Sequence, residues 1–192
     1  MNPEATPDPQ RAALSELLRS RRTIHDFAPG TPPREAVLAA LEHARWVPNH
    51  HRTEPWRFHL LGPAAVARVV ELNTELVRAK NGDTAAQAKR QRWLAMPGWL
   101  VVTCRRSEDA QVEREDYAAC CCAIHNFSLY LWQAGIGAKW STGKVIRDSR
   151  FLTAIGADPA QEFTVGLVWF GYPQTIPAQS RRPLADVLRD VD

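Results

Sequence analysis

Long apolar runs and a leader segment are both missing from this sequence of 192 residues. A bilayer-spanning helix needs about 18 consecutive apolar residues, which no window of the chain provides, so we expect no membrane span. Residues 1–10 are polar and rich in proline, whereas a secretory signal has a basic start and an apolar centre. We therefore expect a cytoplasmic protein with a disordered tail over residues 1–10.

Cysteine is also scarce, with four residues in the whole chain: Cys104 and the run Cys120–Cys122. Adjacent cysteines suit neither a disulfide framework nor the CxxC spacing of zinc sites. The run lies in an apolar context, which raises thiol pKa values and lowers reactivity. We expect small buried residues in a reducing compartment, with no assigned function for the run.

A strong charge of either sign is absent, because 24 Lys and Arg face 21 Asp and Glu, for a net charge of +3. Neither sign forms a long block, which argues against nucleic acid as a partner. Hydrophobic residues make up 45% of the chain and charged residues 23%, as in ordinary globular proteins. The length suits one core, so residues 11–192 are expected to form a single domain.

Sequence motifs for the common catalytic and nucleotide sites are missing too. Gly135 and Gly137 begin like a dinucleotide-binding fingerprint, but Trp140 occupies the third glycine position and the segment follows a helix. Ser141 does not lie in a GxSxG elbow. His50, His51 and Glu54 share a loop, but adjacent histidines rarely point at one ion, so we expect no metal site.

What the chain does contain is alternating helical and strand patterns. Apolar periodicity predicts helices at residues 11–20, 33–46, 64–80, 84–93, 115–134, 145–156 and 184–188. Segments rich in β-branched and aromatic residues predict strands at 56–61, 99–104, 136–143 and 163–172. This order indicates an α+β domain. The polar segment 84–93 is expected to be exposed, and whether it acts as a lid is left open.

Three of these helices carry apolar residues from which burial can be predicted. Helix 11–20 has one apolar face, made by Leu14, Leu17 and Leu18. Helix 33–46 is expected to be capped by Thr31 and to bury Val37, Leu38, Leu41 and Trp46. Helix 115–134 is apolar nearly all round, which predicts burial on every face and suggests a partner subunit as part of its cover.

Four segments have the chemistry of a binding site. They are the basic stretch at Arg21–Thr23, the polar loop 48–55, residues 140–143, and the pair Arg181–Arg182. Guanidinium groups bind phosphate in a bidentate manner, and hydroxyls add donors. Taken alone, the first basic stretch also fits a solvated helix end, and Arg181–Arg182 also fits a surface pair before a C-terminal helix. Taken together, without an evident catalytic acid, base or metal, they favour a bound anionic, planar cofactor.

The same segments give the chain a resemblance to a known family. Residues 21–27, 44–58, 135–143 and 171–184 resemble, in order, the four signatures of the flavin (FMN)-dependent nitroreductase family. The chain's length is most similar to the small, single-domain branch of that family. The resemblance covers nearly the whole chain.

The resemblance implies a mixed or antiparallel sheet flanked by helices in an intertwined homodimer, with FMN at the subunit interface and helix 115–134 at its core. It implies an oxidoreductase in which NADH or NADPH passes hydride through the flavin, in a ping-pong cycle, to a nitroaromatic, a quinone or a similar acceptor. Asn49 and His50 would approach the flavin from the partner subunit, and His50 is the one possible catalytic acid or base. The implied cofactor-binding residues are Arg21, Arg22, Thr23, Asn49, His50, Trp140, Ser141, Thr142, Gly143 and Arg181.

Two positions depart from the family pattern. His25 stands where the common signature has Arg, and Glu54 stands where it has Gln or Asn. A carboxylate near the flavin ring would disfavour its anionic reduced form, so the role of Glu54 is left open. Two rivals from other classes also remain: a non-catalytic flavin or nucleotide carrier or sensor, and a nucleic-acid binder, which the small net charge disfavours.

Overall fold

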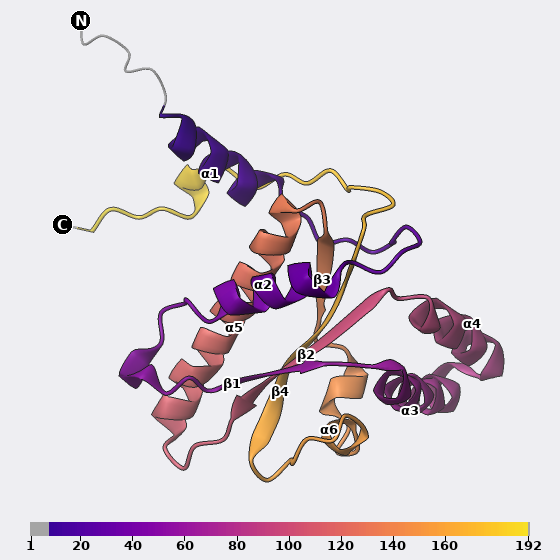
Figure 1. Cartoon of the computed structure of the whole chain (residues 1–192). Helices are drawn as coiled ribbons and strands as arrows, with labels where there is room; N and C mark the ends of the chain where they lie inside the picture. Colours follow the sequence, from indigo (N-terminus) through magenta and orange to yellow (C-terminus); the bar gives the residue numbers. More distant parts are fainter. Residues whose placement is uncertain (1–7, 192) are drawn as a thin grey trace, which may run out of the picture.

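One antiparallel sheet organises the structure, a computed structural model that describes residues 8–191 (Figure 1). Within that range four strands pair in the order β1-β2-β4-β3. β2 and β4 occupy the middle and are buried along most of their length, which explains their continuous apolar sequences. The strands are β1 Trp56–Leu60, β2 Gly98–Arg105, β3 Gly137–Ser141 and β4 Glu162–Gly171.

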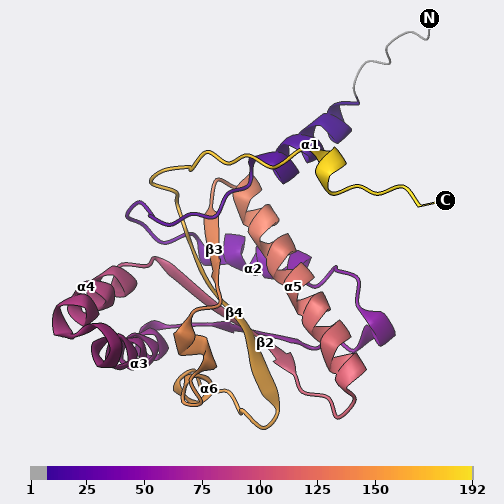
Figure 2. The same cartoon turned by 180° about the vertical axis from the view of Figure 1, so that it is seen from behind.

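Helices cover both faces of this sheet (Figures 1 and 2). On one face, Leu100 and Val102 of β2 pack with residues of α2 and α5. On the other face, the alternate residues Trp99 and Val101 pack with residues of α3, α4 and α6. The helices are α1 Pro9–Ser20, α2 Arg34–Ala44, α3 Pro63–Asn81, α4 Asp83–Leu94, α5 Ala110–Gln133 and α6 Phe151–Ala154, with short 3-10 turns η1 His50–Arg52, η2 Lys144–Arg147 and η3 Leu184–Asp186.

The α+β prediction is confirmed, and all four predicted strands are present. The predicted helix 145–156 is wrong, because it is two short turns, η2 and α6, around a break at residues 148–150. There the Asp148 carboxylate accepts the backbone N–H of Arg150 at 3.0 Å, a local bond that competes with helix continuation. The predicted helix 184–188 is a single 3-10 turn.

Three of the predicted helix starts are also corrected. α1 begins at Pro9, capped by Asp8, so the tail prediction is wrong for residues 9–10, and residues 1–7 lie outside the described part. α5 begins at Ala110 rather than 115, because the Asp109 carboxylate accepts the N–H groups of its first turn. Thr31 does not cap α2, whose N-cap is Pro33.

Burial of the amphipathic helices differs from the sequence prediction in specific places. In α2, Val37 is buried, but Leu38 is 46% exposed and Trp46, just beyond the helix, is 78% exposed. α1 buries no residue, and its Leu14 and Leu18 lie open to solvent. Nothing in the described range 8–191 covers these apolar groups.

The long helix α5 is buried along one face and not all round. Its buried residues include Ile124 and Phe127, whereas Ala118 and His125 are exposed in the single chain. The cysteine prediction holds for Cys104 and Cys120, which are buried, but is wrong for Cys122, which is exposed. A side-chain hydrogen bond with Cys104, together with burial, raises the pKa of Cys120, and burial raises the pKa of Cys121, as predicted.

The polar helix α4 is docked against the body of the protein. It packs along α3 and buries Ala86 and Trp93, so the expectation of an exposed helix is only partly correct. The Trp93 ring meets Trp99 and Trp169 edge-on, at centroid distances of 5.6 and 5.1 Å. Within residues 8–191 we find no helix whose length and apolarity would let it cross a bilayer.

Candidate functional site: a basic cavity that continues along strand β3

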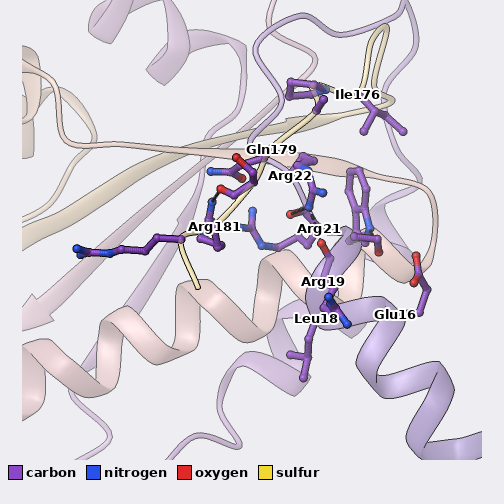
Figure 3. A pocket seen from close by; sticks show the side chains of 14 residues that line it. Glu16, Leu18, Arg19, Arg21, Arg22, Ile176, Gln179 and Arg181 are labelled. Atoms are coloured by element: carbon purple, nitrogen blue, oxygen red, sulfur yellow. Dashed lines mark hydrogen bonds between the residues drawn. The ribbon is translucent and has the colours of Figure 1, made fainter. Parts of the chain in front are cut away.

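A cavity of about 970 Å³ lies where α1 ends, beside the last turn of α5. Residues of the segment 19–22, Trp132 of α5 and the C-terminal arm 176–182 line it. Figure 3 shows Arg21 and Arg22 beside Gln179 and Arg181 of this arm. Arg21 and Arg181, far apart in the sequence, both line this cavity. The structure thus brings together two of the predicted basic segments.

Local hydrogen bonds fix the geometry of this cavity. α1 ends at Ser20, and Arg21 turns into an extended conformation, with φ −56° and ψ 131°. The Arg22 guanidinium donates to the carbonyl oxygens of Arg19 at 2.6 Å and Arg21 at 3.0 Å, which satisfies acceptors at the helix end. The Trp132 indole N–H donates to Ser20 Oγ at 3.0 Å and so ties α1 to α5.

The arginines of the cavity repel one another. Arg21 is half-buried, and burial together with the nearby charges of Arg181 and Arg22 lowers its pKa. Among the ion pairs formed within residues 8–191, none joins these three arginines to a carboxylate. A bound anion would relieve this repulsion, so the cavity has the electrostatics of a phosphate or carboxylate site.

From the cavity the chain continues as an extended segment alongside β3. Thr23 bridges Ala138 in parallel, and the Ile24 N–H donates to the Ala138 carbonyl at 3.1 Å. Ile24 is completely buried against Gly137, where any Cβ would overlap with its side chain. Because side chains alternate, Thr23 and His25 point to the exposed side. At ~3.3 Å per residue, His25 lies about 13 Å from Arg21.

A second, smaller basic cavity lies at the His25 end of this segment. His25, Lys89, Arg92 and Lys139 line it, together with Trp93, Met96 and Trp169. Lys139 Nζ lies 5.4 Å from the centroid of the Trp169 ring. Burial, with the charges of Arg92 and Lys89, lowers the pKa of Lys139, while Asp26 opposes this.

This second cluster of cations was not predicted from the sequence. Lys89 and Arg92 lie in the polar helix α4, where charged residues are expected at the surface. The sequence did contain one indication of it. His25 follows Thr23 by two residues, so in an extended segment both side chains point to the same side.

The segment 140–143 lies farther along β3 in the same direction. Since the bridge at Thr23 is parallel, residues beyond Ala138 run beside and past His25. Trp140 is 39% exposed, and its indole N–H donates to the Val165 carbonyl at 3.4 Å. Its ring lies over Gly166, where a Cβ would overlap with the indole. Ser141 ends β3, and Thr142 and Gly143 are exposed just before η2.

Asn49 and His50 do not join this site within one chain. His50 Nδ1 lies 2.6 Å from Glu115 near the start of α5, whereas Trp132 lines the arginine cavity near its end. At 1.5 Å per residue these two points on α5 are about 26 Å apart. A common site for Asn49, His50 and Arg21 therefore requires a second copy of the chain.

The charge of Arg21 can be detected through its neighbour His125. Partial burial and the Arg21 charge lower the pKa of His125. We predict that Arg21→Gln raises this pKa, because removing a nearby cation favours the protonated imidazole. NMR titration of the histidine ring protons measures the change, with His43 on α2 as the internal control. An unchanged His125 pKa would show that Arg21 does not lie close to His125.

Comparison with known proteins gives a consistent pattern. The family model described as "Nitroreductase family" matches residues 18–172. The Bacillus subtilis protein named "Putative NAD(P)H nitroreductase YfhC" is 30% identical over 183 residues, covering 92% of this chain and 93% of the relative.

Solved structures show the same fold. The nitroreductase-like family protein from Bacillus cereus superimposes with a TM-score of 0.82 at 28% identity, covering 93% of this chain and 96% of its own. A structure from Desulfovibrio desulfuricans, described as a "putative nitroreductase in complex with fmn", has a TM-score of 0.75 at 24% identity, covering 97% of this chain and 99% of its own.

Proposed function

Because the chain belongs to the nitroreductase family, we propose that it is an FMN-dependent oxidoreductase that takes hydride from NADH or NADPH. The observation that carries the proposal is the convergence of Arg21 and Arg181 at one end of an exposed strip along β3. At one end of the strip lie the arginines suited to a phosphate. The other end, at His25, is also basic and lies about 13 Å away, given the rise per residue of an extended chain. These two ends match an elongated ligand with a phosphate on one side and a polar ring on the other.

The residues present fit FMN. Arg21, Arg22 and Arg181 would hold the phosphate, since no carboxylate among residues 8–191 pairs with these three guanidiniums. Thr23 would offer its hydroxyl to the ribityl chain between the two ends. The ring would lie toward His25 and Lys139, within reach of Ser141, Thr142 and Gly143 beyond β3, with the Trp140 indole as an apolar neighbour.

Bound FMN would supply the hydride chemistry, accepting hydride from the nicotinamide and delivering it to the acceptor in a ping-pong cycle. The role of this chain is to anchor, orient and tune it. Lys89, Arg92 and Lys139 at the His25 end would favour negative charge on a ring bound there. We place nitroaromatics, quinones or similar flat acceptors on the exposed side of the strip.

A homodimer with FMN at the subunit interface completes the site. Asn49 and His50 would reach the flavin of the partner subunit, since about 26 Å of α5 separates them from the arginine cavity of their own chain. Exposed apolar side chains support the same arrangement, because the single chain leaves them uncovered. They include Leu14, Leu18, Trp46, Ile176, Leu184 and Leu188.

The activity has a direct test. The purified protein is expected to be yellow, and anaerobic NADH or NADPH should bleach the visible flavin absorbance on the order of seconds to minutes. Adding a quinone or nitroaromatic should then restore it. Bound FMN that neither nicotinamide reduces would instead support a non-catalytic flavin carrier or sensor. A protein that binds no FMN would refute the proposal.

A further inference from the structure

The loop before β1 is strained in a way that points to a role of its own. His51, Arg52 and Glu54 all have positive φ angles, of 58°, 52° and 44°. Residues other than glycine seldom adopt this conformation, and each instance costs free energy that the surrounding structure must offset. Strain of this kind concentrates at functional sites.

A polar network anchored in α5 holds the loop in place. Asn49 Oδ1 accepts the Glu54 N–H at 2.8 Å, and Asn49 Nδ2 donates to Thr53 Oγ1 at 3.0 Å. The Thr53 hydroxyl donates to Asp116, whose carboxylate is buried on α5. The loop conformation is therefore fixed by the body of the protein.

The strained backbone brings the two adjacent histidines to the same side. The rings of His50 and His51 stack, with centroids 3.8 Å apart and planes inclined by 26°. His50 Nδ1 lies 2.6 Å from Glu115 Oε2. One nitrogen from each ring and one Glu115 oxygen all lie within 4.8 Å of one another. Consecutive side chains usually point apart, and the expectation of no metal site rests on that. His50 and His51 instead lie on the same side.

We propose that His50, His51 and Glu115 form a binding site for a late first-row divalent cation, with Zn²⁺ as the best match. Two imidazoles and one carboxylate form a ligand set that Zn²⁺ accepts, with a fourth position open. At Zn–ligand distances of about 2.1 Å, tetrahedral ligands lie roughly 3.4 Å apart. The exposed His51 ring can close the remaining gap by rotating about its side-chain bonds.

A hydrogen bond orients the Glu115 carboxylate toward the two histidines. Gln111 Nε2 donates to Glu115 Oε1 at 2.8 Å, which leaves Oε2 directed at the histidines. All three ligands belong to one chain. His51 and Glu115 have no part in the flavin site proposed above, which shares only His50 with this cluster.

The test is Zn²⁺ titration of the full, tag-free protein by calorimetry, with the visible absorption of Co²⁺ as a probe of coordination. We expect one ion per chain. His51→Asn should weaken Zn²⁺ binding at least ~10-fold, since asparagine tolerates positive φ but is a poor zinc ligand. Glu115→Gln, which keeps the side-chain shape, should have a similar effect.

Two variants serve as controls for other zinc ligands on the surface. His43→Gln removes an exposed imidazole on α2, and Cys122→Ser removes the exposed thiol of α5. Neither should change the affinity. Thermal unfolding of each variant verifies that it folds. No binding at millimolar Zn²⁺, or wild-type affinity in folded His51→Asn and Glu115→Gln, would overturn the proposal.

Discussion

Replacing Arg21 with alanine is expected to weaken FMN binding by roughly 10- to 150-fold. This range corresponds to the ~1.5–3 kcal/mol typical of a hydrogen bond to a charged group. Arg21 is half-buried at the cavity wall and lies near Arg22 and Arg181, so its guanidinium would meet the phosphate together with theirs. Titration of the apoprotein with FMN, followed by flavin fluorescence, measures the change.

The same substitution should leave the apoprotein at least as stable as the wild type. Arg21 is repelled by Arg22 and Arg181, and its removal relieves that repulsion. A loss of FMN affinity without loss of stability distinguishes a ligand-binding role from a structural one. Thermal unfolding of the two apoproteins provides the comparison.

Arg114→Ala is the matched control for Arg21→Ala. Arg114 is an exposed arginine in the first half of α5, away from the arginine cavity. Its loss should leave FMN affinity unchanged, and the dimer should persist in both variants. Equal FMN affinity in Arg21→Ala and the wild type would remove Arg21 from the site.

Much of the fold could be predicted from local sequence patterns. Strand β4 is rich in β-branched and aromatic residues, and α3 is bounded by Pro63 and Gly82, so both follow from propensity and turn chemistry. Predictions failed where a side chain competes with the backbone, as Asp148 does before α6. They also failed where burial depends on distant partners, as for Leu38 of α2 and Trp46 just beyond it.

The candidate site, too, could be predicted from the sequence only in part. Arg21 and Arg181 were predicted as parts of one site, and the structure brings them together. Lys89 and Lys139 were missed, because only the pairing of Thr23 with β3 shows that α4 lies at the far end of the strip. The geometry of His51 also could not be predicted, since positive φ angles at residues other than glycine have no reliable sequence signal.

Replacing Trp93 with alanine is expected to destabilise the protein by about 3–5 kcal/mol, as for other buried aromatic side chains. Trp93 is 6% exposed, and its ring lies edge-on to Trp99 and Trp169. Trp93 is the large buried side chain of α4, whose sequence is otherwise mostly polar. Urea unfolding measures the loss, and Leu94→Ala, at a neighbouring residue that is 47% exposed, should cost less than about 1 kcal/mol.

Hydrogen exchange of α4 in Trp93→Ala separates two descriptions of this helix. If α4 is part of the cooperative fold, its amides and those of β2 lose protection together, because Trp99 and Trp169 belong to the same buried cluster. If α4 is an independently opening lid, only residues 83–94 lose protection and the urea midpoint hardly moves. We expect the first result. Since Lys89 and Arg92 flank Trp93 in the second basic cavity, FMN affinity should fall in parallel with the loss of α4 protection.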